Sequence, residues 1–461
     1  MCLLPLFPAF AGGEEFGTAT LAGAARVPAS AVDSQGETLG GFGSGMALVP
    51  GSWHDKKGVF TGTLAMLPDR GWNTEGTTDY RARLQFFDVT LKPAKVPDGM
   101  RMRYRRTLLL TDAAGGSTTG LDASGMRPVA GGLPDLPLGA NGHVAMDSEA
   151  VAMPKRGDIW VSDEYGPYVY RFDAHGKMVA ALRPPDAFIP MRDGRESFSA
   201  NSPPLGTNYD VGNPQSGRQN NQGFEGMSIT PDGKRMFVMN QSALVQDLDP
   251  GAPKTTRRHV RVLAYDLMGA SPRLVHEYVV ALPLYSDGKT DGLVAAQSEL
   301  LALNDHQFLL LCRDSGGGQS LKRDASAYRS ILSVELNGAS DIVGRYDGVG
   351  QAVSPLGVLR SDITPAKTSL LVDMNDNAQL KRFGLHNGAP NDANDLYEKW
   401  ESMALAPAGG SPDDYFLFVG SDNDFITQKG MMAGKPYADA SGANVDSLVL
   451  VYRVRVPGLR R

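Results

Sequence analysis

Residues 158–182 read Asp158-Ile159-Trp160-Val161-Ser162, Asp163-Glu164-Tyr165-Gly166-Pro167, Tyr168-Val169-Tyr170-Arg171-Phe172, Asp173-Ala174-His175-Gly176 and Lys177-Met178-Val179-Ala180-Ala181-Leu182. The first, third and fifth of these pieces are short runs of apolar residues, several of them β-branched or aromatic, which is typical of strands. The second and fourth pieces concentrate Gly, Pro and Asp, the residues that tight turns require. The stretch therefore predicts three consecutive antiparallel strands.

The same alternation of short strands and tight turns extends along most of the chain. Hairpins are predicted within 226–238 and 299–311, and single strands at 415–419 and 448–456. Long amphipathic helices are hard to find, and the best helical candidate is the short segment 394–400. We therefore predict an all-β fold.

A glutamate opens the predicted inner strand in four of the repeated units. These residues are Glu149, Glu225, Glu299 and Glu401, which follow one another at intervals of 76, 74 and 102 positions. Units of about 40–50 residues are typical of β-propellers, so this chain length suggests six or seven blades. We expect one propeller domain over residues 12–461, with the four glutamates meeting at a mouth of its central channel.

Two further segments have a distinct composition. Residues 183–222 are rich in Asn, Ser, Pro and Gly, and we expect this long insertion loop to lie over the channel. Residues 3–10 are apolar and lead into Ala9-Phe10-Ala11, which matches a signal-peptide cleavage site after Ala11. Residues 1–11 are therefore interpreted as the remnant of a signal peptide, and the mature protein is expected to be secreted or periplasmic.

Composition narrows the choice of partners. No other apolar run reaches the ~18 residues of a membrane helix, so no membrane span is expected. Cys2 lies in the segment that we expect to be removed, which leaves Cys312 as a lone thiol. The net charge of −6 argues against a nucleic-acid partner. We expect a monomer with a small-molecule partner, and the family resemblance described below implies that this partner is an ester.

Common hydrolase signatures are absent, since the chain contains neither G-x-S-x-G nor H-E-x-x-H. The remaining candidates are acidic residues, because acids that share one channel raise each other's pKa and call for a cation. Oxygen ligands select hard ions, and Ca²⁺ accepts many of them in flexible geometry. The expected metal ligands are Glu149, Asp163, Glu225, Glu299, Asp314, Asp422 and Asp424.

The catalytic roles are expected to divide between acids and arginines. Arg70 and Arg313 are candidates for gripping a phosphate or carboxylate and for stabilising charge in the reaction, with Glu401 beside them as a substrate-binding residue. One of Glu149, Glu164 or Glu225 would act as general base. Each of these acids could instead form a structural ion pair.

Six short motifs carry a resemblance to a known family. They are Gly40-Gly41-Phe42-Gly43-Ser44-Gly45, Leu67-Pro68-Asp69-Arg70-Gly71, Trp160-Val161-Ser162-Asp163-Glu164-Tyr165-Gly166-Pro167, Gly223-Phe224-Glu225-Gly226, Cys312-Arg313-Asp314 and Ser421-Asp422-Asn423-Asp424-Phe425. In this order they resemble the esterase-like activity of phytase family, from about residue 38 to the C-terminus. The resemblance implies an exported propeller with hydrolytic activity on phosphate or other esters. The chain departs from the family pattern at Ala150 and Ser402, where Gly is usual, and at Cys312, where an acid is usual.

Three hypotheses follow. The first is a metal-assisted hydrolase of phosphoric esters, in which the cation lets an acidic protein accept an anionic substrate. The second is a Ca²⁺-dependent hydrolase of carboxylic esters or lactones on the same scaffold. The third is a non-catalytic binding propeller whose acids hold a structural ion, because fold does not decide function.

Overall fold

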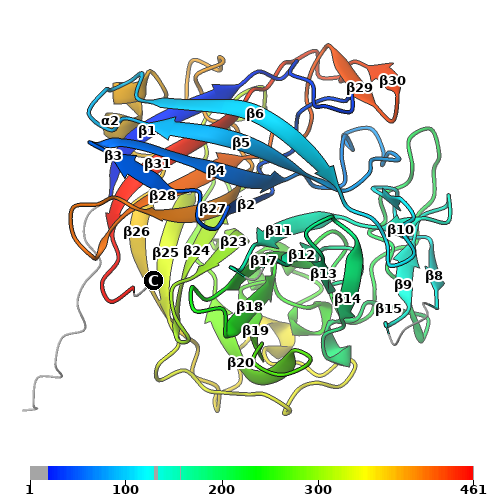
Figure 1. Ribbon diagram of the computed structural model, residues 1–461. Coiled ribbons are helices and arrows are strands. Elements are labelled where there is room, and N and C mark those ends of the chain that lie inside the picture. The colour runs from blue at the N-terminus through cyan, green and yellow to red at the C-terminus, as the bar shows by residue number, and fades with distance from the viewer. Residues whose placement is uncertain (1–18, 129–132, 156, 460–461) are drawn as a thin grey trace, which may run out of the picture.

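The computed structural model describes residues 19–128, 133–155 and 157–459. Its regular structure is mostly β-strand, arranged in many small antiparallel sheets (Figure 1), which confirms the all-β prediction. Residues 394–399 form no helix, contrary to expectation. Among the described residues no helix is long and apolar enough to cross a membrane. The short helices are α1 (Pro253–Thr256), α2 (Asn377–Leu380), η1 (Asp186–Phe188), η2 (Val245–Asp247), η3 (Pro355–Gly357) and η4 (Lys381–Phe383).

Six sheets of the described residues contain four or more strands each, and five of them follow one plan. The first consists of β2 (Gly45–Leu48), β4 (Val59–Leu67), β5 (Arg83–Leu91) and β6 (Met100–Leu109), with β3 (His54–Lys56) paired to β4. The second consists of β11 (Ser148–Ala152), β12 (Ile159–Asp163), β13 (Val169–Phe172) and β14 (Met178–Leu182). β12, β13 and β14 are the three strands predicted from residues 158–182.

The other three of these sheets come later in the chain. The third consists of β17 (Phe224–Ile229), β18 (Arg235–Asn240), β19 (His259–Asp266) and β20 (Arg273–Ala281). The fourth consists of β23 (Ala296–Ala302), β24 (Gln307–Arg313), β25 (Arg329–Glu335) and β26 (Lys367–Asp373). The fifth consists of β27 (Trp400–Pro407), β28 (Asp414–Ser421), β31 (Ser447–Arg455) and β1 (Thr20–Val27), so it joins the two ends of the chain.

The first strands of these sheets are in contact with one another. β2 contacts β11, β11 contacts β17, β17 contacts β23, β23 contacts β27, and β27 contacts β2 again. Five sheets therefore meet through their inner strands, whereas six or seven blades were expected. Apolar side chains fill the space between neighbouring sheets, as where Phe237 of β18 packs with Leu300 of β23 and Phe308 of β24.

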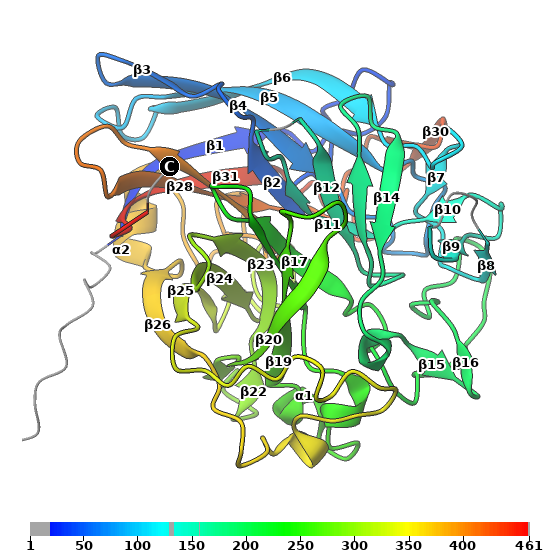
Figure 2. The same cartoon turned by 60° about the horizontal axis from the view of Figure 1, so that its bottom comes forward.

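A smaller sheet lies outside this arrangement, at the edge of the molecule (Figures 1 and 2). It consists of β7 (Thr118–Thr119), β8 (Gly125–Arg127), β9 (Leu136–Leu138) and β10 (Val144–Ala145). Three short hairpins complete the strands, namely β15 (Met191–Arg192) with β16 (Arg195–Glu196), β21 (Leu284–Tyr285) with β22 (Leu293–Val294), and β29 (Gly430–Met432) with β30 (Lys435–Tyr437).

Two sequence predictions concern the ends and the thiols. The predicted signal-peptide remnant, residues 1–11, lies outside the described residues, as does Cys2. Cys312 is a free thiol buried in β24, as expected.

Candidate functional site

Acidic side chains line a cavity of about 280 Å³ next to the starts of inner strands β11, β17 and β27. Eight carboxyl groups face only three cationic side chains there, so the cavity favours a cation. The acids are Asp69, Asp147, Glu149, Glu164, Glu225, Glu398, Glu401 and Asp424, and the cations are Arg70, Arg313 and Lys399. Asn73, Asn221, Gln241 and Ser315 complete the lining.

β-bulges deliver three of the repeat-related glutamates to this cavity. The pairing register shifts between Ser148 and Val151 in β11, between Phe224 and Gly226 in β17, and between Trp400 and Ser402 in β27. Glu149, Glu225 and Glu401 lie at these shifts. A bulge turns one residue out of the regular alternation and is a common way to aim a side chain at a site.

The fourth glutamate of the repeat, Glu299, does not line the cavity. In β23 the register shifts between Gln297 and Glu299, so Ser298 occupies the position that Glu225 and Glu401 hold in their strands. Glu299 accepts a hydrogen bond from the backbone N–H of Leu300 at 2.7 Å. The prediction that four glutamates converge therefore holds for three of them, because a shift of one residue turns a strand side chain to the other face.

Asp147, Glu149 and Glu164 form the most compact acidic group in the cavity. One ligand oxygen from each lies within 4.8 Å of the others. Burial, reinforced by Glu225 and Asp147, raises the pKa of Glu149 well above its usual value. Burial and the charge of Asp147 raise the pKa of Glu164 to about 8. Among the described residues, none donates a hydrogen bond to the Glu149 carboxylate, which leaves it free to bind a ligand.

Glu164 is held in place by a close approach of two backbone segments. Its Oε1 accepts a hydrogen bond from the N–H of Gly223 at 3.1 Å. A Cβ added to Gly223 would lie 2.2 Å from the carbonyl oxygen of Glu164, so only glycine fits there. This contact explains why the motif Gly223-Phe224-Glu225-Gly226 begins with glycine.

Glu225 and Glu401 both line the cavity, and their negative charges repel each other. Burial and the charges of Glu164 and Glu401 raise the pKa of Glu225 well above its usual value. Its Oε1 accepts a hydrogen bond from the side chain of Gln241 at 2.9 Å, whereas Oε2 is buried without a hydrogen-bond partner among the described residues. Arg313 donates a hydrogen bond to Glu401, and this buried ion pair closes one side of the cavity.

Arg70 closes another side. Its guanidinium donates to Asp147 at 2.7 Å and its backbone N–H donates to the same carboxylate at 3.2 Å. It also donates to Asn221. Asn221 is the one residue of segment 183–222 that lines the cavity. This segment was predicted to lie over the channel, and Asn221 is its only contribution to the cavity lining.

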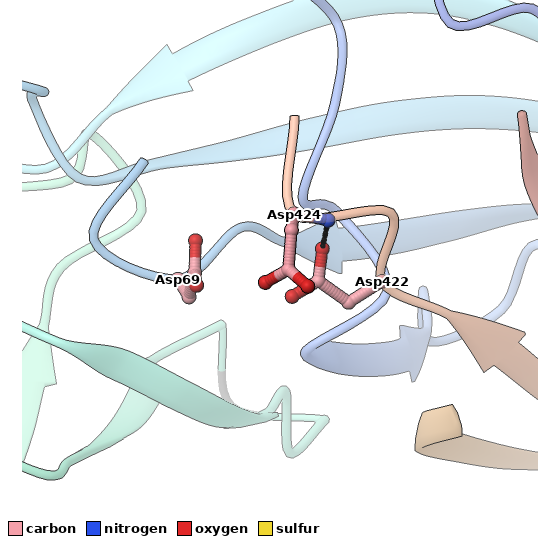
Figure 3. A group of neighbouring side chains, drawn as sticks. All are labelled: Asp69, Asp422 and Asp424. Atoms are coloured by element: carbon pink, nitrogen blue, oxygen red, sulfur yellow. Dashed lines mark hydrogen bonds between the residues drawn. The ribbon is translucent and has the colours of Figure 1, made fainter. Parts of the chain in front are cut away.

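A second acidic group, Asp69, Asp422 and Asp424, also has oxygen atoms within 4.8 Å of one another. Figure 3 shows the three carboxyl groups gathered from two separate loops. Lys399 fills this group, since its Nζ lies 2.6 Å from Asp422, 2.8 Å from Asp424 and 3.8 Å from Asp69. Burial opposes the charge of Lys399, but Asp422 and Asp424 prevail and raise its pKa. The ammonium group supplies here the charge that a metal ion was expected to supply.

Two other predicted metal ligands, Asp163 and Asp314, do not line the cavity. Asp163 accepts hydrogen bonds from the N–H groups of Asp147, Tyr165 and Gly166 and from the hydroxyl of Tyr170, at 2.8–3.2 Å. Asp314 accepts from the hydroxyl of Ser326 and the N–H of Ala327, and pairs with Arg323. With both oxygens of each carboxylate already engaged, the two residues hold turns together.

Several cavity residues were missed in the sequence analysis, namely Asp69, Asp147, Glu398 and Lys399. Their spacing from the predicted glutamates could have identified two of them. Asp147 precedes Glu149 by two positions, and Lys399 precedes Glu401 by two, so each pair shares one face of an extended chain. Asp69 is adjacent to Arg70 in a quoted motif.

One family model matches most of this chain. Residues 38–425 match the family model described as Phytase-like, esterase-like activity of phytase. A protein of Arthroderma benhamiae described as an uncharacterized secreted protein is 40% identical over 450 residues, which span 89% of this chain and 87% of that protein.

Solved structures show only remote likeness. A luciferin-regenerating enzyme is 12% identical with a TM-score of 0.31, over 92% of this chain and 94% of its own. The PQQ-bound aldose sugar dehydrogenase of Streptomyces coelicolor is 11% identical with a TM-score of 0.28, over 95% of this chain and 100% of its own. Likeness this weak assigns neither an activity nor a substrate.

Proposed function

This chain belongs to the esterase-like activity of phytase family, and we propose that it is an exported hydrolase of phosphoric esters that works with a divalent cation in its acidic cavity. The relative described as secreted supports export, to the outside of the cell or to a periplasm. The single observation that carries the cation requirement is the group of Asp147, Glu149 and Glu164, in which Glu149 has no hydrogen-bond donor among the described residues.

The proposal includes the architecture that presents this cavity. We infer one propeller of five blades, because five sheets contact one another in cyclic order through their inner strands. Pairing of β1 with β31 would close the last blade with the first strand of the chain. The acidic cavity then lies at one mouth of the central channel, where loops from several blades converge.

The donor set of the cavity fits a hard cation. Glu149 and Glu164 offer carboxylate oxygens. Burial is the main cause of their raised pKa values, and the charges of neighbouring acids add to it, a repulsion that a bound cation would relieve. Oxygen-only ligands of this kind suit Ca²⁺. The group around Lys399 does not fit a further ion, because the ammonium already occupies it. A Ca²⁺ ion at Glu149 would neutralise substrate phosphate and increase the acidity of a nearby water.

The chain's own residues supply the remaining roles. Arg70 and Arg313 each pair with one acid, while the Nε atom of each is buried without a hydrogen-bond partner among the described residues. These N–H groups are available to hold phosphoryl oxygens as charge develops. Glu225 is the proposed general base, because its raised pKa and free Oε2 suit proton abstraction from water. Water would attack phosphorus, the P–O ester bond would break, and the alcohol would leave with a proton.

Hydrolysis assays on chelator-stripped protein test this proposal. We expect release of phosphate from nitrophenyl phosphate or inositol hexakisphosphate to need added Ca²⁺ and to fall strongly in Glu149→Gln. Glu299→Gln is the matched control, because Glu299 lies outside the cavity. Cleavage of nitrophenyl acetate without cleavage of the phosphates would identify a carboxylic-ester hydrolase instead. Ca²⁺ binding without turnover of either substrate would identify a binding protein.

A further inference from the structure

A second cavity, of about 520 Å³, lies at the other ends of the same inner strands. The acidic cavity adjoins their first residues, whereas this one is lined by the last residues of β2, β11, β17 and β23 and by the middle of β27. Its volume is within the range of small-molecule sites, which is about 300–1,000 Å³. The two cavities therefore offer different chemistry at the two ends of one set of strands.

The larger side chains that line this second cavity are mostly apolar. Its larger side chains include Met46, Trp53, Met153, Trp160, Met403 and Leu405. Trp160 is 5% exposed, and Trp53 is fixed by a hydrogen bond from its indole N–H to the carbonyl of Pro407 at 2.9 Å. Methionine side chains adapt to ligands of irregular or flexible shape. These walls suit an alkyl chain more than a sugar or a phosphate.

Two cationic side chains line this cavity, Lys155 and Arg171, and the more buried of them is Arg171. The Arg171 guanidinium lies 5.7 Å from the centroid of the Trp160 ring. Its Nε is buried without a hydrogen-bond partner, and no carboxylate of the described residues forms an ion pair with it. Of the two acids in the lining, Asp232 is already paired with Lys234 at 3.2 Å. The lining also contains one further acid, Asp158, and one further cation, Lys155.

We propose that this second cavity binds an amphiphilic monoanion, a carboxylate on an alkyl chain, with the carboxylate at Arg171 and the chain among the methionine and tryptophan side chains. Charge-assisted hydrogen bonds from a guanidinium to a carboxylate are strong where water is scarce. Burial of the chain supplies the remaining affinity through the hydrophobic effect. The site is separate from the acidic cavity and does not depend on the hydrolase proposal.

Titration of the full chain with laurate, below its micellar concentration, tests this site by calorimetry and by tryptophan fluorescence, since Trp53 and Trp160 line the cavity. We expect one laurate per chain and a change in fluorescence. A series from octanoate to laurate should tighten about fourfold for each added methylene. This series needs no variant, so it remains informative if a substitution prevents folding.

Variants and alternative probes decide the role of Arg171. Arg171→Met should weaken laurate binding about tenfold or more, Arg171→Lys should retain part of the affinity, and Arg273→Met on the surface should change nothing. Dodecanol should bind more weakly than laurate. Absence of laurate binding, equal affinity for dodecanol, tighter binding of dodecyltrimethylammonium, or unchanged affinity in a folded Arg171→Met would each overturn the proposal.

Discussion

The ammonium group of Lys399 lies 2.6 Å from a carboxylate oxygen of Asp422 and 2.8 Å from one of Asp424. A side-chain cation therefore sits among acids that resemble a metal site by composition alone. Within the described part of the chain, no lysine forms an ion pair with Asp147, Glu149 or Glu164, and Arg70 pairs with Asp147 only. This difference separates the two groups and supports one divalent cation per chain rather than two.

Replacement of Lys399 by Met should open the second group to a cation. The variant would leave Asp69, Asp422 and Asp424 buried without their partner, so the free energy of unfolding in chelator should fall by about 3 kcal/mol. Added Ca²⁺ should restore stability, and metal analysis should find one more ion per chain than in the unaltered protein. Lys289→Met, at an exposed lysine, is the control. Unchanged stability in Lys399→Met would contradict the role given to the ammonium group.

The buried pair of Arg313 and Glu401 should show strong coupling. Arg313→Met leaves the buried Glu401 carboxylate with only Lys399, whose Nζ lies 3.6 Å away, and should cost about 3 kcal/mol in the free energy of unfolding, measured with urea. Combining it with Glu401→Gln should recover part of that loss, because the second change removes the stranded charge. Strictly additive losses in the double variant would show that the two side chains act independently.

Stability without cation should fall as the pH rises. Burial raises the pKa of Glu164 to about 8, from a usual value of 4.5, and that of Asp69 to about 7, from 3.8. The folded state then holds protons that the unfolded state has released, so the stabilisation is complete below about pH 4 and is lost towards pH 8. Urea unfolding in chelator at several pH values measures this trend. Ca²⁺ should reduce the slope, and a rise in stability over the same window would refute the predicted sign.

Substitution of Glu225 by Gln should affect turnover more than cation binding. If Glu225 takes the proton from water, kcat should fall about 100-fold or more, while the affinity for Ca²⁺ changes less than in Glu149→Gln. Parallel rate measurements and calcium titrations on both variants test this division. Equal losses of calcium affinity in the two variants would make Glu225 a ligand instead of a base.

The sequence predicted the order of the strands and the acidic character of the site. It did not predict the positions of Glu299 and Lys399. Turn residues and short apolar runs located β12, β13 and β14, and the repeat located Glu149, Glu225 and Glu401. The placement of Glu299 was wrong because a bulge in β23 shifts the pairing register by one residue. The residue types in Gln297-Ser298-Glu299 do not indicate that shift. Lys399 was overlooked because its partners, Asp422 and Asp424, lie on a loop that is distant until the fifth sheet forms.

Titration of Ca²⁺ into chelator-stripped protein by calorimetry tests the central claim most directly. The unaltered chain and Glu299→Gln should each bind one Ca²⁺ with the same affinity, whereas Glu149→Gln should bind at least about tenfold more weakly. Equal calcium binding by folded Glu149→Gln, or no calcium binding by the unaltered chain, would contradict the assignment of the acidic cavity as a cation site.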